Sequence, residues 1–310
     1  MASLFITGGS GRLGQPLIRE ALERGDQVLA HARSAASAER LRALGAQVLE
    51  GELGALDPKA LSGVDQVLHL AGGFRGEGRW TPDRLNRELT EQLLAWLPDL
   101  PLTYVSSAAV YGDRSNLWIE EDFDPSPNTR YGHSKVAAER LVAQRGARIV
   151  RLAAVYGPGQ PFLMAERIRE GKAWLPGEGR NHIPTVHALD AARGLLRVSE
   201  AGEPGQIYHL ADRSQPTLGD FYAAVHRQVG GTPVRFWSTY VPSYVQVAIA
   251  RQNERLQSRI GQRPRLTPDA LKLWTASVRL RTERIKQELG FSWRYADHDA
   301  GVTAACRPSA

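Results

Sequence analysis

The feature that most constrains the fold of this chain is a run of glycines directly after its first apolar segment. Residues 3–7 form a short apolar run typical of a buried strand, and Gly-Gly-Ser-Gly-Arg-Leu-Gly leads from it into a helical pattern at 13–24. Glycines spaced in this way permit a tight turn, close approach of backbone to a pyrophosphate, and close packing of helix on strand. The residues of this turn expected to bind a dinucleotide are Gly8, Ser10, Gly11, Arg12, Leu13 and Gly14.

Strand-like and helix-like segments alternate through the first half of the chain. Further apolar runs lie at 27–32, 47–50, 66–70, 103–106 and 148–153, with helical patterns among them at 38–44, 82–96 and 131–145. Short strands that alternate with longer helices indicate parallel βαβ units with right-handed crossovers. The sequence therefore predicts an α/β fold, a Rossmann-like doubly wound parallel sheet with helices on both faces.

The regular alternation ends near residue 156, where turn-rich segments at 157–159 and 176–179 follow. A strand-like run at 206–210 is expected to rejoin the sheet, and helical patterns lie at 218–229, 243–260, 268–275 and 282–289. We expect a dinucleotide-binding domain over 1–156 plus about 186–211. A smaller, mostly helical substrate lobe would then comprise 157–185 and 212–310.

The end of the second strand bears on the choice of cofactor. NAD sites usually place a carboxylate there, about 20 residues beyond the glycines, for the ribose 2′-hydroxyl. This chain has His31-Ala32-Arg33 instead. Arg33, aided by Arg12, could pair with the 2′-phosphate of NADP, or both could be solvated surface residues. We favour NADP over NAD.

Three side chains suggest proton transfer. Tyr131 and Lys135 are four residues apart at the start of a predicted helix, so both would lie on one face, where an ammonium lowers the pKa of a phenol. Ser107 follows a strand whose C-terminal end would line a ligand crevice. Its hydroxyl could hold a substrate oxygen, or it could be a turn residue bonded to its own backbone.

In this order, the motifs resemble the extended short-chain dehydrogenase/reductases, also called the NAD-dependent epimerase/dehydratase family. The resemblance covers most of the chain, from the glycine turn through 69–72, 107–112, 131–135 and 151–158 to 187–190. It implies that Ser107 orients the substrate oxygen, Tyr131 is the acid/base, and Lys135 tunes it and binds ribose. It also implies cofactor contacts at Glu52, Leu53, Leu70, Ala71, Gly72, Asn86 and Val155.

Departures from the family pattern narrow the expected reaction. Members that dehydrate nucleotide sugars carry acids after the hydroxyl residue, whereas Ala108 and Ala109 stand here and cannot transfer protons. Ala154 replaces an asparagine that grips the sugar diphosphate, which favours a smaller or more apolar carbonyl or alcohol. Substrate contacts are expected from Phe74, Ala108, Tyr156, Phe162 and Trp174, although each aromatic could equally be core.

Three functions stay open at this point. The leading one is an NADP-dependent ketone reductase or alcohol dehydrogenase, the second an epimerase with retained NAD, and the third a dinucleotide-sensing regulator without chemistry. By resemblance a homodimer would form through helices 82–96 and 131–145. The apolar residues Leu89, Leu93 and Trp96 could line that interface or belong to the core.

The remaining composition argues against other classes of function. The net charge of +6 is spread along the chain without a basic block, so we expect no nucleic-acid partner. Cys306 is the single cysteine, the histidines are scattered, and no apolar run approaches 20 residues. We therefore expect no disulfide, metal or membrane span and, because the first residues lead straight into a strand, a cytoplasmic protein without a leader.

Overall fold

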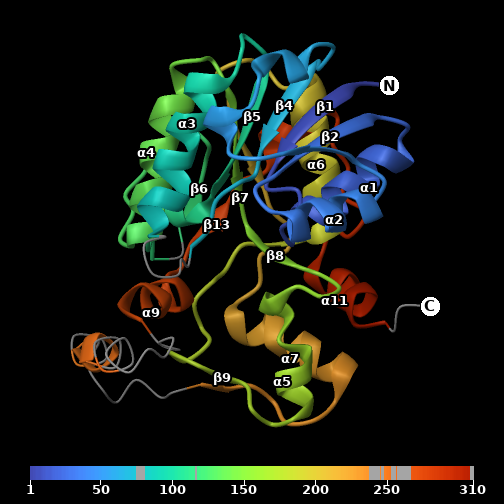
Figure 1. Cartoon of the computed structure of the whole chain (residues 1–310). Helices are drawn as coiled ribbons and strands as arrows, with labels where there is room; N and C mark the ends of the chain where they lie inside the picture. The colour runs from blue at the N-terminus through green and yellow to red at the C-terminus, as the bar shows by residue number, and fades with distance from the viewer. Residues whose placement is uncertain are drawn as a thin grey trace.

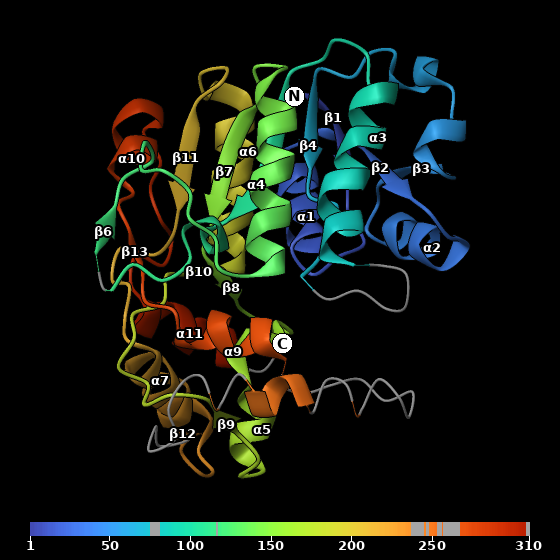
Figure 2. The same cartoon turned by 90° about the vertical axis from the view of Figure 1, so that its left-hand side faces the viewer.

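The computed structural model, drawn in Figures 1 and 2, describes residues 1–74, 81–115, 117–236 and 267–307, together with 245, 248–252 and 256. The helix predicted at 243–260 therefore lies largely outside the described residues. Two layers of helices enclose a central sheet, and a smaller lobe lies beyond the carboxyl ends of its strands (Figure 1).

Seven strands form the sheet in the order β11-β7-β5-β4-β1-β2-β3, and every neighbouring pair is parallel. Their bounds are β1 Ser3–Thr7, β2 Gln27–Ala32, β3 Gln47–Glu50, β4 Gln66–His69, β5 Leu102–Ser107, β7 Arg148–Leu152 and β11 Ile207–Leu210. The strand order reverses between β1 and β4, which is where ligands bind in open α/β sheets. The predicted Rossmann-like doubly wound fold is confirmed.

Alternation along β1 shows how the apolar runs build two cores. Phe5 and Ile6 are both fully buried but belong to different clusters, because successive strand residues point to opposite faces. Ile6 packs in the cluster that contains Leu17 and Leu195, and Phe5 in the cluster that contains Leu93. Both faces of the sheet are thus covered, which explains why its strands read as continuous apolar runs.

The helices divide between these faces (Figure 2). On one side lie α1 Gly14–Glu23, α2 Ala35–Ala43 and α6 Ala188–Ala201, and on the other lie α3 Leu89–Trp96 and α4 Arg130–Ala143. Leu93 and Trp96 are buried in the core with Phe5, so two of the three apolar residues considered for a dimer interface pack inside the subunit. The homodimer expected from the family stays a prediction.

The lobe has its own apolar core beneath the carboxyl ends of the strands (Figure 1). It contains α5 Ala165–Arg169, α7 Leu218–Val229, α9 Pro268–Thr275 and α11 His298–Cys306, with strands β9 Trp174–Leu175 and β12 Arg235–Phe236. Two paired strands, β8 Ala154–Tyr156 and β10 Thr185–His187, connect it to the sheet. No helix within the described part of the chain is long and apolar enough to cross a membrane.

Part of the segment 212–310, which the sequence assigns to the lobe, packs on the main sheet. Helix α10, Glu283–Leu289, contacts β11 and α6, and its Ile285 and Leu289 join the same core cluster as Ile6. Leu280 of β13, Arg279–Leu280, also belongs to that cluster, and β13 pairs with β6, Trp118–Ile119. Short helical turns complete the fold: η1 Leu53–Ala55, η2 Pro58–Leu61, η3 Arg84–Glu88, η4 Ala108–Tyr111 and η5 Pro161–Leu163.

Candidate active site

The glycine turn lies against the segment that follows β4. Gly8 has φ +76°, and a Cβ there would lie 2.6 Å from the backbone nitrogen of Ala71 and 2.8 Å from the carbonyl carbon of Leu70. A Cβ at Gly14 would lie 2.5 Å from the Gly8 carbonyl oxygen. Both positions thus require glycine, one for its backbone conformation and close neighbours, the other for close packing where α1 begins.

The start of α1 presents backbone donors beside this turn. Leu13, the N-cap residue, has an apolar side chain that cannot accept hydrogen bonds from the first-turn N–H groups. Such groups, together with the helix dipole, favour an anion such as a pyrophosphate. Segment 157–160 is tied to the turn, since Arg12 Nη1 donates to the Gly159 carbonyl at 3.2 Å and Gln160 Nε2 donates to the Arg12 carbonyl at 2.9 Å.

The carboxyl end of β2 carries a histidine in place of the usual acid. His31 Nε2 donates to the Gly51 carbonyl at 2.8 Å, and burial lowers the pKa of this imidazole. Arg33 and Glu52 are exposed just beyond, whereas Leu53 is buried. The basic group at this strand end is therefore solvent-facing, as a phosphate partner would need to be.

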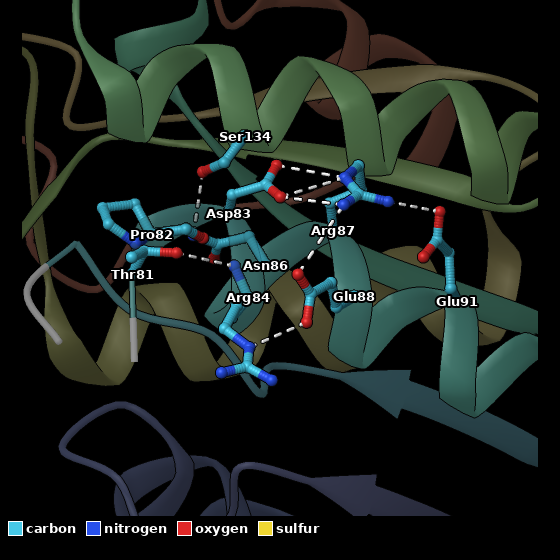
Figure 3. Close-up of polar contacts among 9 residues, drawn as sticks. All are labelled: Thr81, Pro82, Asp83, Arg84, Asn86, Arg87, Glu88, Glu91 and Ser134. Atoms are coloured by element: carbon cyan, nitrogen blue, oxygen red, sulfur yellow. Dashed lines mark hydrogen bonds and ion pairs between the residues drawn. The ribbon is translucent and has the colours of Figure 1, made fainter. Parts of the chain in front are cut away.

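Asn86 joins the segment after β4 to the neighbouring helix α4 (Figure 3). Its side chain is fully buried in the π-helical turn η3, a kind of turn that is frequent at functional sites. The amide accepts from the Gly73 N–H at 3.2 Å and lies within donating distance of the carbonyls of Gly73 and Pro82 and the hydroxyl of Ser134. Arg87, one residue on, pairs outward with Asp83 and Glu91.

Gly72 is enclosed by two residues of the predicted site. A Cβ at this position would lie 2.5 Å from Asn86 Oδ1 and 3.3 Å from Lys135 Nζ. We expect Gly72→Ala to displace the Asn86 amide and to weaken dinucleotide binding by about tenfold, equivalent to about 1.4 kcal/mol, measured by fluorescence titration with NADPH. Gly54→Ala is the matched control, because a Cβ there meets nothing within 4 Å. Equal affinities of the two variants would contradict this reading.

Strand β5 and helix α4 bring Ser107 and Tyr131 together. The Ser107 hydroxyl lies close enough to the Tyr131 phenol to lower its pKa. Ser107 Oγ also accepts from the Ala109 N–H at 3.2 Å, so the substrate and turn roles considered for this serine are compatible in one geometry. The ring of Phe74 stands edge-on to the Tyr131 ring, with centroids 6.0 Å apart.

Lys135 lies one turn further along α4 and is 4% exposed. Its Nζ donates to the Val105 carbonyl at 2.9 Å and to the Tyr104 hydroxyl at 3.2 Å, and it lies 4.8 Å from the Tyr104 ring centroid. Burial lowers the pKa of Lys135 to about 8, while Glu139 acts to raise it. The amine is thus held against β5.

The expected lowering of the Tyr131 pKa by Lys135 requires correction. Burial raises the pKa of Tyr131, and the influence that lowers it is the nearby Ser107 hydroxyl. The physical reason is the direction of the lysine side chain, which points to Val105 and Tyr104 on β5. A shared helix face therefore did not determine where the amine lies.

The residues predicted to contact substrate do not converge. Phe74 is 43% exposed beside Tyr131, and Ala108 begins the turn that follows Ser107. Tyr156 is fully buried in the lobe, with its ring 5.2 Å from that of Phe221. Trp174 is exposed on β9, at the far end of the lobe in both views (Figures 1 and 2). Phe162 stacks on Trp274 at 5.5 Å.

Of the remaining predicted cofactor residues, Val155 and Leu70 are half-buried, and Ser10 lies within the glycine turn. Tyr104, absent from the sequence prediction, contacts Lys135 directly. The available signal was a tyrosine inside a buried strand, since a buried phenol usually needs a polar partner. Among the described residues, no group of three His, Cys, Asp or Glu side chains could hold a metal ion.

The fold and this geometry define a dinucleotide-binding α/β protein of the Rossmann type. A family model described as "NAD dependent epimerase/dehydratase family" matches residues 4–211, and the chain belongs to this family.

Several relatives are named as reductases, two of them from Stigmatella aurantiaca and Stenotrophomonas maltophilia. One is a 4-hydroxy-2-methyl-3-oxo-4-farnesyl-3,4-dihydroquinoline-1-oxide ketoreductase of Stigmatella aurantiaca, 27% identical over 97% of this chain and 94% of its own. The other is a 2-alkyl-3-oxoalkanoate reductase of Stenotrophomonas maltophilia, 30% identical over 65% of this chain and 66% of its own.

Similarity to solved structures extends over nearly the whole fold. A dTDP-glucose 4,6-dehydratase of Bacillus anthracis, solved in complex with NAD, superposes with a TM-score of 0.76. The match covers 99% of this chain and 96% of that chain at 17% identity. At this identity the likeness shows the fold alone.

Proposed function

We propose that this chain is an NAD(P)-dependent ketone reductase or alcohol dehydrogenase acting on a small or apolar substrate. The observation that carries the proposal is the proximity of Ser107 to Tyr131, close enough to lower the pKa of its phenol, at the carboxyl edge of the sheet, on which the glycine turn also lies. The turn suits a dinucleotide, because Gly8 and Gly14 leave no room for side chains and the α1 N–H groups lie beside it. When bound, the nicotinamide would donate or accept a hydride.

Residues of this chain would transfer the proton that accompanies the hydride. Ser107 holds the carbonyl oxygen of a ketone, and the Tyr131 phenol donates its proton to that oxygen as hydride reaches the carbonyl carbon, which yields the alcohol. Because burial raises the pKa of Tyr131, the phenol keeps its proton at neutral pH. This protonation state favours the direction of reduction.

The surroundings of Ser107 support a substrate of modest size or apolar character. Ala108 and Ala109 follow it and cannot transfer protons, which argues against dehydration. The exposed ring of Phe74 beside Tyr131 offers an apolar surface. The names of the two reductase relatives describe keto substrates with alkyl or farnesyl substituents, in agreement with this inference.

We further propose NADP as the preferred cofactor, on the basis of the exposed Arg33 beyond β2. Arg33 is the principal candidate for the 2′-phosphate because it stands just beyond the carboxyl end of β2, where the adenosine ribose is expected to bind. Arg33→Ala is expected to weaken NADPH binding by about tenfold or more, the effect of one charge-assisted hydrogen bond, and to leave NADH binding within about twofold. Fluorescence titration measures both. Tighter binding of NADH than NADPH by the unaltered protein would contradict the preference.

The function is tested by following NADPH oxidation with a panel of ketones that includes 2-alkyl-3-oxo esters, and with UDP-glucose in parallel. Stoichiometric oxidation with an apolar ketone is the expected result. Conversion of UDP-glucose to its epimer without net cofactor turnover would identify an epimerase instead. Binding of dinucleotide without turnover on any substrate would favour a sensing regulator.

A further inference from the structure

A series of buried polar side chains runs from the end of β1 towards Lys135. Thr7 Oγ1 lies 2.6 Å from His69 Nδ1, and His69 Nε2 lies 3.0 Å from Thr90 Oγ1. Thr90 lies beside Tyr104 and acts to lower the pKa of its phenol, whose oxygen lies 3.2 Å from Lys135 Nζ. Thr7, His69, Thr90 and Tyr104 are all 0% exposed. Strands β1, β4 and β5 and helices α3 and α4 each contribute one residue.

The positions of the hydrogens in this series of side chains follow from the number of N–H and O–H groups that each residue can donate. Thr90 Oγ1 donates its only hydrogen to the Asn86 carbonyl at 2.6 Å, so it accepts from His69. Burial lowers the pKa of His69 to about 3, so its ring is neutral and carries a single N–H, which points to Thr90. The Tyr104 oxygen accepts from the Lys135 ammonium, which has no lone pair with which to accept in return.

We propose that Tyr104 is a positioning residue, whose buried hydroxyl accepts a hydrogen bond from the Lys135 ammonium and holds it at the cofactor side of the sheet. With Val105 it takes two of the three N–H groups of the ammonium, and Gly72 is a further neighbour of the amine, since a Cβ there would lie 3.3 Å from Nζ. The significance of this placement for catalysis rests on the proposed function. At the other end of this series, Thr7 Oγ1 accepts from the Ala71 N–H at 3.4 Å.

Among the described residues, few titratable groups face Lys135. Glu139 faces it from its own helix, Tyr104 from β5 and His69 from β4. Glu139 also binds Arg151 of β7 through both carboxylate oxygens, at 2.9 and 3.1 Å, and so shares its charge with a second cation. The oxygens of Tyr104 and Val105 are the direct partners of the ammonium, which burial otherwise destabilises.

The test is a titration of Lys135 by NMR in protein labelled at lysine, without substrate or dinucleotide. The chain has five lysines, Lys59, Lys135, Lys172, Lys272 and Lys286, so the Lys135 signal can be assigned from its absence in Lys135→Arg. In Tyr104→Phe the ring remains but the acceptor is lost, and we expect the Lys135 midpoint to fall by about one pH unit. Tyr222→Phe, which removes another buried phenol, bonded to the Phe162 carbonyl, should leave the midpoint unchanged.

An unchanged Lys135 midpoint in folded Tyr104→Phe would overturn the proposal. Should that variant fail to fold, Tyr104→Met gives the second test, because it also removes the phenol oxygen that lies 3.2 Å from Lys135 Nζ. A fall of the midpoint in the same direction supports the proposal, and no fall overturns it. Because the readout is a lysine titration and not turnover, a failure here is distinguishable from a failure of the proposed reductase activity.

Discussion

Replacement of Tyr131 by phenylalanine is expected to reduce turnover by about 10²–10⁴-fold, the range typical for loss of a general acid. The ring and its edge-on contact with Phe74 would remain, so the fold and the dinucleotide site should be preserved. We therefore expect NADPH affinity within about threefold of the unaltered protein. Single-turnover NADPH oxidation and fluorescence titration measure the two quantities on the same samples.

Tyr208→Phe is the matched control, since this buried tyrosine lies on β11 and bonds Glu288 at 3.2 Å, within the main domain but outside the proposed site. Turnover close to normal in Tyr131→Phe would show that another group supplies the proton. Equal loss of turnover in both tyrosine variants would point to a general structural effect and remove the support for Tyr131 as the acid.

Lys135→Met is expected to have the second largest effect, and it should act in opposite directions on activity and stability. Loss of the amine proposed to bind the cofactor ribose would lower kcat/KM by about 100-fold or more, the equivalent of about 3 kcal/mol. The folded protein, in contrast, should become more stable at neutral pH by about 1–2 kcal/mol. Burial of the charged amine costs about 3 kcal/mol for a pKa lowered from 10.5 to about 8, and the two lost hydrogen bonds offset part of the gain.

The pH dependence of this stabilisation follows from the same shift. Below pH 8 the amine is charged in both folded and unfolded protein, so the unfavourable burial of charge is fully present. Between pH 8 and 10.5 the folded protein binds fewer protons than the unfolded one, so the unaltered protein gains stability relative to the variant. Urea unfolding across this range should show that the difference in the free energy of unfolding between Lys135→Met and the unaltered protein becomes smaller as the pH rises. A Lys135→Met variant less stable than the unaltered protein at pH 7 would contradict the predicted stabilisation. Lys172→Met, at an exposed lysine, is the control.

The strands of the sheet were predictable because each one leaves a pattern of apolar residues within its own short segment of sequence. The bounds of β1 and β2 agree with the apolar runs in the sequence, since strands buried on both faces leave a continuous pattern and glycines and polar residues interrupt it. The glycine turn was predictable for the same reason: the backbone conformation of Gly8 and the packing of Gly14 are needs of the turn itself.

Contacts between distant segments were not predictable in this way. Tyr156 follows the edge of the sheet, where a ligand contact was expected, but its ring packs under α11, so close to Gly301 that no side chain would fit there. Helix α11, rich in small residues and without a strong apolar stripe, was absent from the sequence prediction. Helix α11 packs against α7, and no pattern within the sequence of α11 itself indicates this contact.

Lys135 illustrates the same limit within the candidate site. The spacing from Tyr131 correctly indicates a shared helix, but the position of the amine is decided by Val105 and Tyr104, about 30 residues earlier in the chain. A helical pattern determines which face a side chain leaves from. The partner that fixes the end of a long, flexible side chain comes from tertiary packing.

The most direct test of the central claim is a crystal structure of the protein with bound NADP⁺. The account predicts the pyrophosphate over the glycine turn at the start of α1, and the reactive carbon of the nicotinamide on the side of the sheet where Ser107 and Tyr131 meet, with room for a substrate carbon about 3–3.5 Å from it. A dinucleotide bound elsewhere, or a nicotinamide too far from the Tyr131 hydroxyl for one substrate to reach both, would contradict it.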